Sequence, residues 1–278
     1  LERGWEGEAS VAAFDEQGGR VVGAPLSMTA LEDPADRVLR AWDLDSGEEQ
    51  VFPLAHLTDA TWKGFLSMRV APDGSVFAGG VGGVRRLTVP GGPKGTVTSE
   101  TVYDTGPGRA HLDLSRDGRF LLAWGTRKAG ELSRFDELIL CDLREGSSRS
   151  ITTHGSALSY GAMDPSGRIV VSAGTDGVVR AGAITGEEPH LLYGHTGPVT
   201  ALAVSPGGRW IASASDDSVR LWPMPDVAKP PFHTLPYEEL MSKLRALTNL
   251  EVVEDETAPT GYRVEVGPFP GWEDVPTW

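Results

Sequence analysis

The stretch GHTGPVTALAVSPGGRWIASASDDSVRLW, from Gly194 to Trp222, decides the fold of this protein. It contains three short apolar runs, VTALAV, RWIASAS and SVRLW, separated by tight turns of glycine, serine and aspartate. Runs of this length with turns between them predict a small antiparallel sheet. One such sheet cannot bury both of its faces, so the stretch needs further units like itself to pack against.

The same pattern recurs along the chain. A turn that ends in glycine, usually followed by arginine, appears as FDEQGGR, APDGS, SRDGR, DPSGR and SPGGR, and its aligned glycines are Gly19, Gly74, Gly118, Gly167 and Gly208. The spacings of 55, 44, 49 and 41 residues fit a repeat of roughly 40–45 residues with loop insertions. A strand-like run lies on each side of every turn, which predicts an all-β array of at least five units.

The last unit resembles a WD40 repeat, through Gly194 and His195 followed by VTALAVSPGGRWIASASDDSVRLW. The pair Trp42 and Asp43 also matches the dipeptide that names this family. The resemblance covers residues from about 10 to 225 and is strongest in the last unit. It implies a β-propeller of WD40 type with at least five blades in this chain.

In that family, four side chains of a blade form a buried hydrogen-bonded chain. The last unit matches all four positions, with His195, Ser213, Asp216 and Trp222. The fourth unit has Asp176, but Gly182 stands where the tryptophan would be. Because buried polar chains mainly make a structure rigid and specific, the resemblance implies that these residues are structural.

The sequence divides into propeller blades over 1–225, a proline-rich linker over 226–235 and an extension over 236–278. In the extension, PYEELMSKLRALTN has leucines at helical spacing, and LEVVED and YRVEVG flank a turn, which predicts a helix followed by a β-hairpin. We expect the leucine face to pack on the propeller. The stretch LRALTNLEVVED…TGYRVEVGPFPGW resembles the C-terminal extension of bacterial WD40 proteins, many of which are multidomain chains with a Ser/Thr kinase domain.

The number of units predicts an incomplete ring. WD40 propellers mostly close with about seven blades, and each blade needs neighbours on both faces. We therefore expect preceding sequence or another chain to complete the ring. The alternative is that the C-terminal hairpin helps to close a smaller ring.

Composition excludes several classes of partner. The net charge is −14 without a cluster of lysine and arginine, which argues against nucleic acid and anionic membranes. No apolar run approaches the roughly 20 residues that span a bilayer. The single cysteine, Cys141, cannot form an internal disulfide, so we expect a reducing, cytoplasmic location.

No motif predicts a catalytic, cofactor or metal site. The six histidines do not have the spacing of metal ligands, and the acidic stretch DLDSGEE at 43–49 stops short of a calcium loop. The glycine-rich GGVGGVRR lacks the Lys-Ser/Thr of a phosphate loop, and G-x-S-x-G does not occur.

Two functional hypotheses remain. The first is a non-catalytic scaffold that docks a protein or peptide, or regulates an attached catalytic domain, through the inserted loops at 25–37, 53–64 and 126–137. Trp62 and Trp124 are its candidate aromatic anchors, although tryptophan more often lies in the core or between blades. The alternative is a hydrolase or lyase whose channel holds a cluster of carboxylates or histidines with shifted pKa values.

Overall fold

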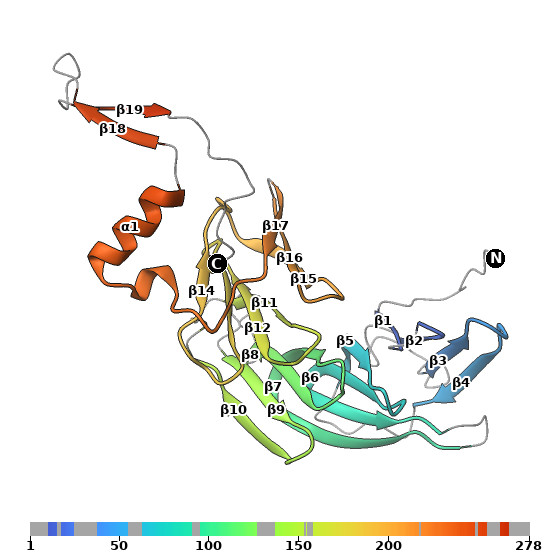
Figure 1. Ribbon diagram of the computed structural model, residues 1–278. Helices are drawn as coiled ribbons and strands as arrows, with labels where there is room; N and C mark the ends of the chain where they lie inside the picture. Colours follow the sequence, from blue (N-terminus) through green and yellow to red (C-terminus); the bar gives the residue numbers. More distant parts are fainter. Residues whose placement is uncertain are drawn as a thin grey trace.

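The computed structural model describes residues 11–15, 18–24, 38–54, 63–90, 95–126, 137–152, 154, 158–216, 218–247, 250–254 and 262–266. Most of the three inserted loops and Trp62 lie outside these residues. The described chain is all-β, with one short α-helix and a 3-10 turn near its C-terminal end (Figure 1).

The first sheet has the strand order β1-β2-β3-β4, with every pair antiparallel. Its strands are β1 (Val11–Phe14), β2 (Arg20–Ala24), β3 (Val38–Asp43) and β4 (Glu49–Pro53). Small and aliphatic side chains alternate along each strand, so one face of the sheet collects Ala13, Val22, Leu39 and Ala41, which are buried against the next sheet.

The second and third sequence units share one six-stranded sheet, in the order β10-β9-β8-β7-β6-β5. Its strands are β5 (Lys63–Val70), β6 (Val76–Thr88), β7 (Thr98–Leu114), β8 (Phe120–Thr126), β9 (Glu137–Asp142) and β10 (Ser147–Ser150). The strands β6 and β7 are long because strand pairing resumes on both sides of the register shifts within them. Within β6 the chain bends sharply at Gly82 and Gly83, which have φ angles of 98° and 118°. This bend brings Arg86 back beside Ser75, and Arg86 Nε donates a hydrogen bond to Ser75 Oγ over 3.1 Å.

The third and fourth sheets follow the predicted pattern of one sequence unit each. The third contains β11 (Leu158–Met163), β12 (Ile169–Gly174), β13 (Val179–Ala183) and β14 (His190–Leu192). The fourth contains β15 (Val199–Val204), β16 (Trp210–Ser215) and β17 (Val219–Pro223).

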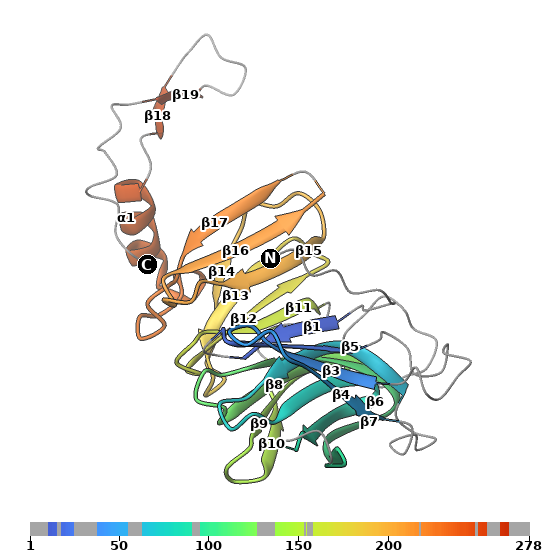
Figure 2. The ribbon, with the colours of Figure 1, turned by 90° about the vertical axis from the view of Figure 1, so that its right-hand side faces the viewer.

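The four sheets stack face to face as the blades of a β-propeller, and Figure 2 shows the third and fourth sheets lying one above the other. Residues of neighbouring layers form successive hydrophobic cores, from the first sheet to the pair formed by the third and fourth. The sequence predicted at least five blades, whereas the structure has four blade sheets among its described residues. The difference arises because the second and third units are joined by continuous strands.

The C-terminal region contains the predicted helix and hairpin. They are the 3-10 helix η3 (Phe232–Thr234), α1 (Tyr237–Leu247), β18 (Leu250–Glu254) and β19 (Tyr262–Val266). Two contacts tie the linker to the third sheet: His190 Nε2 lies 3.1 Å from the Lys229 carbonyl, and His233 Nε2 lies 3.2 Å from Glu188 Oε1. In Figure 1 the hairpin projects away from the sheets. No helix in the described part of the chain is long and apolar enough to cross a bilayer.

Candidate partner-binding site

Three of the four side chains predicted for the hydrogen-bonded chain meet in the fourth sheet. His195 Nε2 lies 2.7 Å from Ser213 Oγ, and the indole Nε1 of Trp222 donates to the same oxygen over 2.8 Å. The two aromatic rings meet edge to face with their centroids 6.1 Å apart. Antiparallel pairing of β16 with β17 brings Ser213 and Trp222 onto one face, where the contacts stiffen the sheet.

Asp216 takes a different position from the predicted one. Its side chain is exposed, and the second ring nitrogen of His195, Nδ1, lies 2.8 Å from Ser215 Oγ and 3.3 Å from Ser218 Oγ. The sequence did not indicate these two serines, because SASDDS has five hydroxyl or carboxyl side chains between the end of β16 and the start of β17. The neighbouring Asp217 lies outside the described residues.

The third sheet contains half of the same arrangement. His154 Nδ1 lies 2.7 Å from Ser172 Oγ, at the same separation in sequence as His195 and Ser213. Gly182 occupies the place of the tryptophan, where a Cβ atom would lie 3.0 Å from Pro189 Cβ and 3.2 Å from His154 Nε2. Burial, together with the nearby Arg180, lowers the pKa of His154 to about 4. Its Nε2 is buried and lacks a hydrogen-bond partner among the described residues.

Trp124, a candidate anchor for a partner, is a core residue. Its side chain is 6% exposed, it stacks on His111 with ring centroids 5.9 Å apart, and a Cβ atom on Gly161 would lie 2.9 Å from its ring. The indole therefore fills the contact between the second and third sheets. This corrects the prediction that Trp124 is a surface anchor, because a side chain enclosed in this way cannot reach a partner.

A cleft of about 430 Å³ opens on the six-stranded sheet, between its second-unit and third-unit halves. Three turns form its rims: the turn after β5, the turn before β8 and the turn between β9 and β10. Phe77, Val102, Cys141 and Leu143 form its apolar wall. The charged side chains around it are Asp73, Arg86, Glu100, Asp117, Arg119, Asp142 and Arg144.

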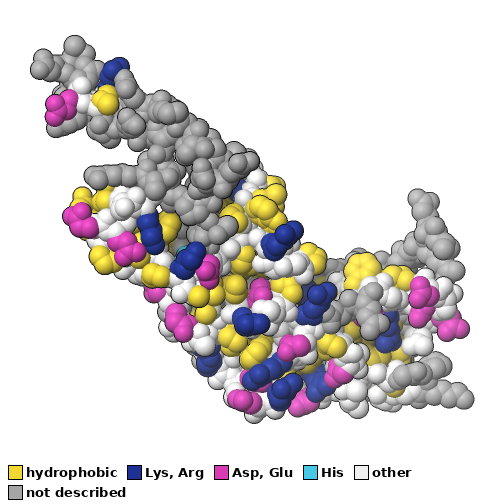
Figure 3. All heavy atoms as spheres, in the orientation of Figure 1, with side chains coloured by type: hydrophobic (Ala, Val, Ile, Leu, Met, Phe, Trp, Pro, Cys, Tyr) yellow, Lys and Arg dark blue, Asp and Glu magenta, His cyan; other side chains and the backbone are white. Residues whose placement is uncertain are grey.

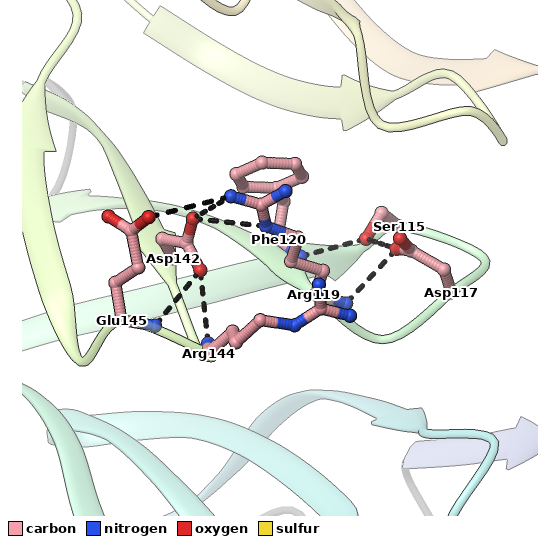
Figure 4. A network of polar contacts seen from close by, with 7 residues as sticks. All are labelled: Ser115, Asp117, Arg119, Phe120, Asp142, Arg144 and Glu145. Atoms are coloured by element: carbon pink, nitrogen blue, oxygen red, sulfur yellow. Dashed lines mark hydrogen bonds and ion pairs between the residues drawn. The ribbon is translucent and has the colours of Figure 1, made fainter.

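Figure 4 shows how Arg119 and Asp142 organise one rim of this cleft. Arg119 donates to Asp142 Oδ2 through Nε over 3.1 Å and through Nη2 over 2.7 Å, and its guanidinium lies over the Phe120 ring, 4.6 Å from the centroid. Asp142 Oδ1 accepts the backbone N–H groups of Arg144 and Glu145. A single carboxylate thus fixes both the arginine and the following turn.

The other rims are held in the same way. Ser115 Oγ donates to Asp117 Oδ1 over 2.7 Å, and Arg86 Nη2 donates to Asp73 Oδ2 over 2.6 Å. Each turn is therefore locked by an aspartate that accepts several hydrogen bonds within or beside it.

These contacts set the charges in the cleft. The hydrogen bonds from Arg119 lower the pKa of Asp142 and raise that of Arg119. Partial burial acts to raise the pKa of Asp73, but hydrogen bonds from Ser75 and the positive charge of Arg86 outweigh it, so the net pKa is lowered. Burial raises the pKa of the Cys141 thiol to about 11. At neutral pH the rims are thus ionised, whereas Cys141 is a protonated thiol, which is a poor nucleophile.

A second hollow, of about 300 Å³, lies where the strands β5, β7, β11 and β15 meet. Its carboxylate, Asp113, accepts a hydrogen bond from Arg69 Nε over 2.8 Å and another from the Met163 backbone N–H over 2.9 Å. Glycoside hydrolysis needs two converging carboxylic acids, and the described lining of this hollow supplies one acid that is already paired. Among the described residues, no three His, Cys, Asp or Glu side chains group as metal ligands.

The comparison with protein families gives one match. Residues 186–223, which include β14 to β17 and the His195, Ser213 and Trp222 contacts, match the family described as "WD domain, G-beta repeat". No curated protein matches the chain. WD40 repeats are usually non-catalytic and generally serve in protein-interaction scaffolds. The chain therefore carries a WD40 repeat at residues 186–223, within a β-propeller arrangement that has four blades among the described residues.

Proposed function

We propose that this protein is a non-catalytic interaction scaffold that holds a peptide segment of a protein partner in the cleft of the six-stranded sheet. The WD40 repeat supports an interaction role in general. The observation that carries the choice of site is the state of the charges around the cleft: its aspartates are tied to arginines or to their own turns, while Arg144 and Glu100 are exposed and their side chains have no ion pair among the described residues.

The two uncompensated charges define the partner's chemistry. In Figure 4 the Arg144 side chain extends along the rim toward the turn that contains Asp117. An arginine in this position suits a carboxylate, which it can bind through two parallel hydrogen bonds. Glu100, on the strand β7, suits a lysine or arginine, and the partly exposed side chains of Val102 and Leu143 suit an apolar side chain. The expected ligand is therefore a segment with an acidic, a basic and an apolar residue.

The rims favour binding because they are already ordered. Arg119 is held by two hydrogen bonds and by the Phe120 ring, and Asp142 anchors the turn that bears Arg144. A ligand that docks here does not have to order these side chains, which reduces the entropic cost of binding.

The wider setting is also a proposal. The tail that resembles bacterial WD40 extensions supports a module of a larger, cytoplasmic bacterial protein that docks a partner or regulates an attached catalytic domain. The buried, protonated Cys141 is compatible with a reducing compartment. The hydrophobic cores support five blades in an incomplete ring: Phe77 and Val84 of β6 pack with Leu121 and Ile139 of β8 and β9, so the two halves of the six-stranded sheet act as two layers.

A peptide selection tests the site. Displayed peptides are selected on the purified chain, and the affinity of a selected peptide is measured by fluorescence polarisation. We expect peptides that carry both signs of charge, and Arg144→Glu should weaken their binding by at least about tenfold, which corresponds to about 1.4 kcal/mol. Arg209→Glu is the matched control, because Arg209 is also exposed but lies in the turn before β16, away from the cleft. Selection of no peptide, or equal effects of the two substitutions, would contradict the proposal.

A further inference from the structure

One face of the fourth sheet is apolar and uncovered. It carries Ala201, Ala203, Trp210, Ala212, Ala214, Val219 and Leu221, which the cross-strand pairs place on the same side. Val219 is 75% exposed, Leu221 68% and Trp210 47%. Figure 3 shows hydrophobic side chains gathered at the position of β17. We call this set of residues the outer face of β15–β17.

The third sheet shows what this kind of face does when it has a neighbour. Ala162 pairs with Val171 and Val171 with Ala181 in the third sheet, just as Ala203 pairs with Ala212 and Ala212 with Leu221 in the fourth. The residues of the third sheet, including Val171, Ala173, Val179 and Ala181, are fully buried against Leu202, Val204, Ile211 and Trp222. The complementary surface for such a face is therefore a sheet face with bulky aliphatic side chains and a tryptophan.

The first sheet presents a surface of this complementary kind at the other end of the molecule. Phe14 pairs with Val21 and Val21 with Trp42, the same pattern as Val204 with Ile211 and Ile211 with Trp222. Phe14 is 65% exposed, and Val51 on β4 is 42% exposed. We call Phe14, Val21, Trp42 and Val51 the outer face of β1–β4. In the fourth sheet the matching residues pack on the third sheet, whereas in the first sheet Phe14 and Val51 are exposed and Val21 and Trp42 are half-buried.

We propose that a second copy of this chain covers the outer face of β15–β17 with its own outer face of β1–β4. Both halves of the contact are present in one molecule, and the contact repeats the internal packing of the third sheet on the fourth. An exposed apolar face of this kind usually marks an interaction surface in a soluble protein. The inference rests on the incomplete ring proposed above.

The geometry of this contact is head to tail. Each copy uses one surface to bind the copy ahead and a different surface to bind the copy behind, so assembly continues until the copies close a ring or form a filament. Substitution of either surface therefore leaves the opposite surface intact. This property makes the proposal testable by complementation.

The experiment measures the mass of the purified full chain by light scattering and analytical ultracentrifugation across concentrations. We expect species larger than one chain, with Leu221→Lys and Phe14→Lys each reducing self-association by at least tenfold, so that each variant alone is a monomer. An equimolar mixture of the two variants should form a 1:1 dimer, because one variant still has its outer face of β1–β4 and the other its outer face of β15–β17. Tyr237→Lys, on the exposed start of α1, is the control and should assemble like the unmodified chain.

The experiment distinguishes failure of the head-to-tail contact from failure of the proposed scaffold function. Circular dichroism confirms that both variants fold. A monomeric unmodified chain, or folded variants that do not form a mixed dimer, would overturn the head-to-tail contact and would assign the open faces to a different sheet-bearing partner. Peptide binding at the cleft, measured on the same samples, reports independently on the proposed scaffold function, since Leu221 and Phe14 do not line the cleft.

Discussion

The third and fourth sheets have the same strand pairing but different surroundings. Val179 of the third sheet and Val219 of the fourth are matched positions, each facing an alanine on the neighbouring strand. Val179 is fully buried, and Val219 is 75% exposed. The local sequence therefore sets the pairing and the face, whereas burial depends on whether a further sheet packs on that face.

The buried polar contacts also differ between the two sheets, and here the fourth sheet, which is the less enclosed, has the larger number. The fourth sheet has the more complete hydrogen-bonded chain, from His195 through Ser213 to Trp222. The third sheet has only His154 and Ser172, and yet its histidine is the more deeply buried of the two. A sheet enclosed on both sides stays rigid through packing alone, while the terminal sheet has packing on one side and relies more on its polar contacts.

The largest expected effect comes from a charge placed at the matched valines. Val179→Asp should lower the free energy of unfolding by more than about 4 kcal/mol, because it buries an unpaired carboxylate between two sheets. Val219→Asp should change it by less than about 0.5 kcal/mol in the monomeric Leu221→Lys background, because residue 219 is exposed there. Urea unfolding followed by circular dichroism measures both. Similar losses in the two variants would show that the fourth sheet is already covered within one chain.

The sequence predicted the sheets where one unit forms one blade. In the third and fourth sheets the turn glycines Gly167 and Gly208 have positive φ angles of 68° and 69°, as turns after a β-strand require. The sequence did not predict that the second and third units share one sheet, in which β6 and β7 include Gly83 and Gly106 and their pairing resumes after each register shift. Glycine predicts that the chain can turn, but not whether the ladder of hydrogen bonds is interrupted there.

An effect of intermediate size is expected on the pH dependence of stability, and it arises from His154 beside the third sheet. The pKa of His154 is near 4 in the folded protein and about 6.5 when unfolded, so the unfolded chain binds the extra proton between these values. Stability is therefore full above pH 6.5 and falls as the pH decreases toward 4. Between pH 7 and pH 5 the unmodified chain should lose about 2 kcal/mol more than His154→Gln.

This measurement compares the pH dependence of the free energy of unfolding in the unmodified protein and in His154→Gln. Burial also lowers the pKa of His190, but that contribution is the same in both proteins and cancels. Urea titrations at the two pH values provide the comparison. If His154→Gln has the same pH dependence as the unmodified chain, the His154 ring is not enclosed in solution.

The candidate site was less predictable than the fold. Trp124 was a reasonable anchor by residue type, but the sequence alone did not indicate that Gly161 on the next sheet would admit its ring. Arg119 and Asp142 come from different strand turns 23 residues apart, and no spacing rule links them. The register of β8 with β9, which pairs Phe120 with Asp142, brings them together. Contacts between charged side chains that depend on strand register cannot be predicted from the sequence until the pairing of the strands is known.

The smallest expected effect concerns the indole that the fourth sheet has and the third sheet lacks. Trp222→Phe keeps an aromatic ring but removes the donor to Ser213 Oγ, so the free energy of unfolding should fall by about 1 kcal/mol beyond the loss of packing. Ser213→Ala separates these two contributions in a double-mutant cycle. If the hydrogen bond matters, Trp222→Phe costs about 1 kcal/mol less in the Ser213→Ala background than in the unmodified chain. Equal costs in the two backgrounds would mean that Trp222 stabilises the sheet by packing alone, without a contribution from its hydrogen bond to Ser213.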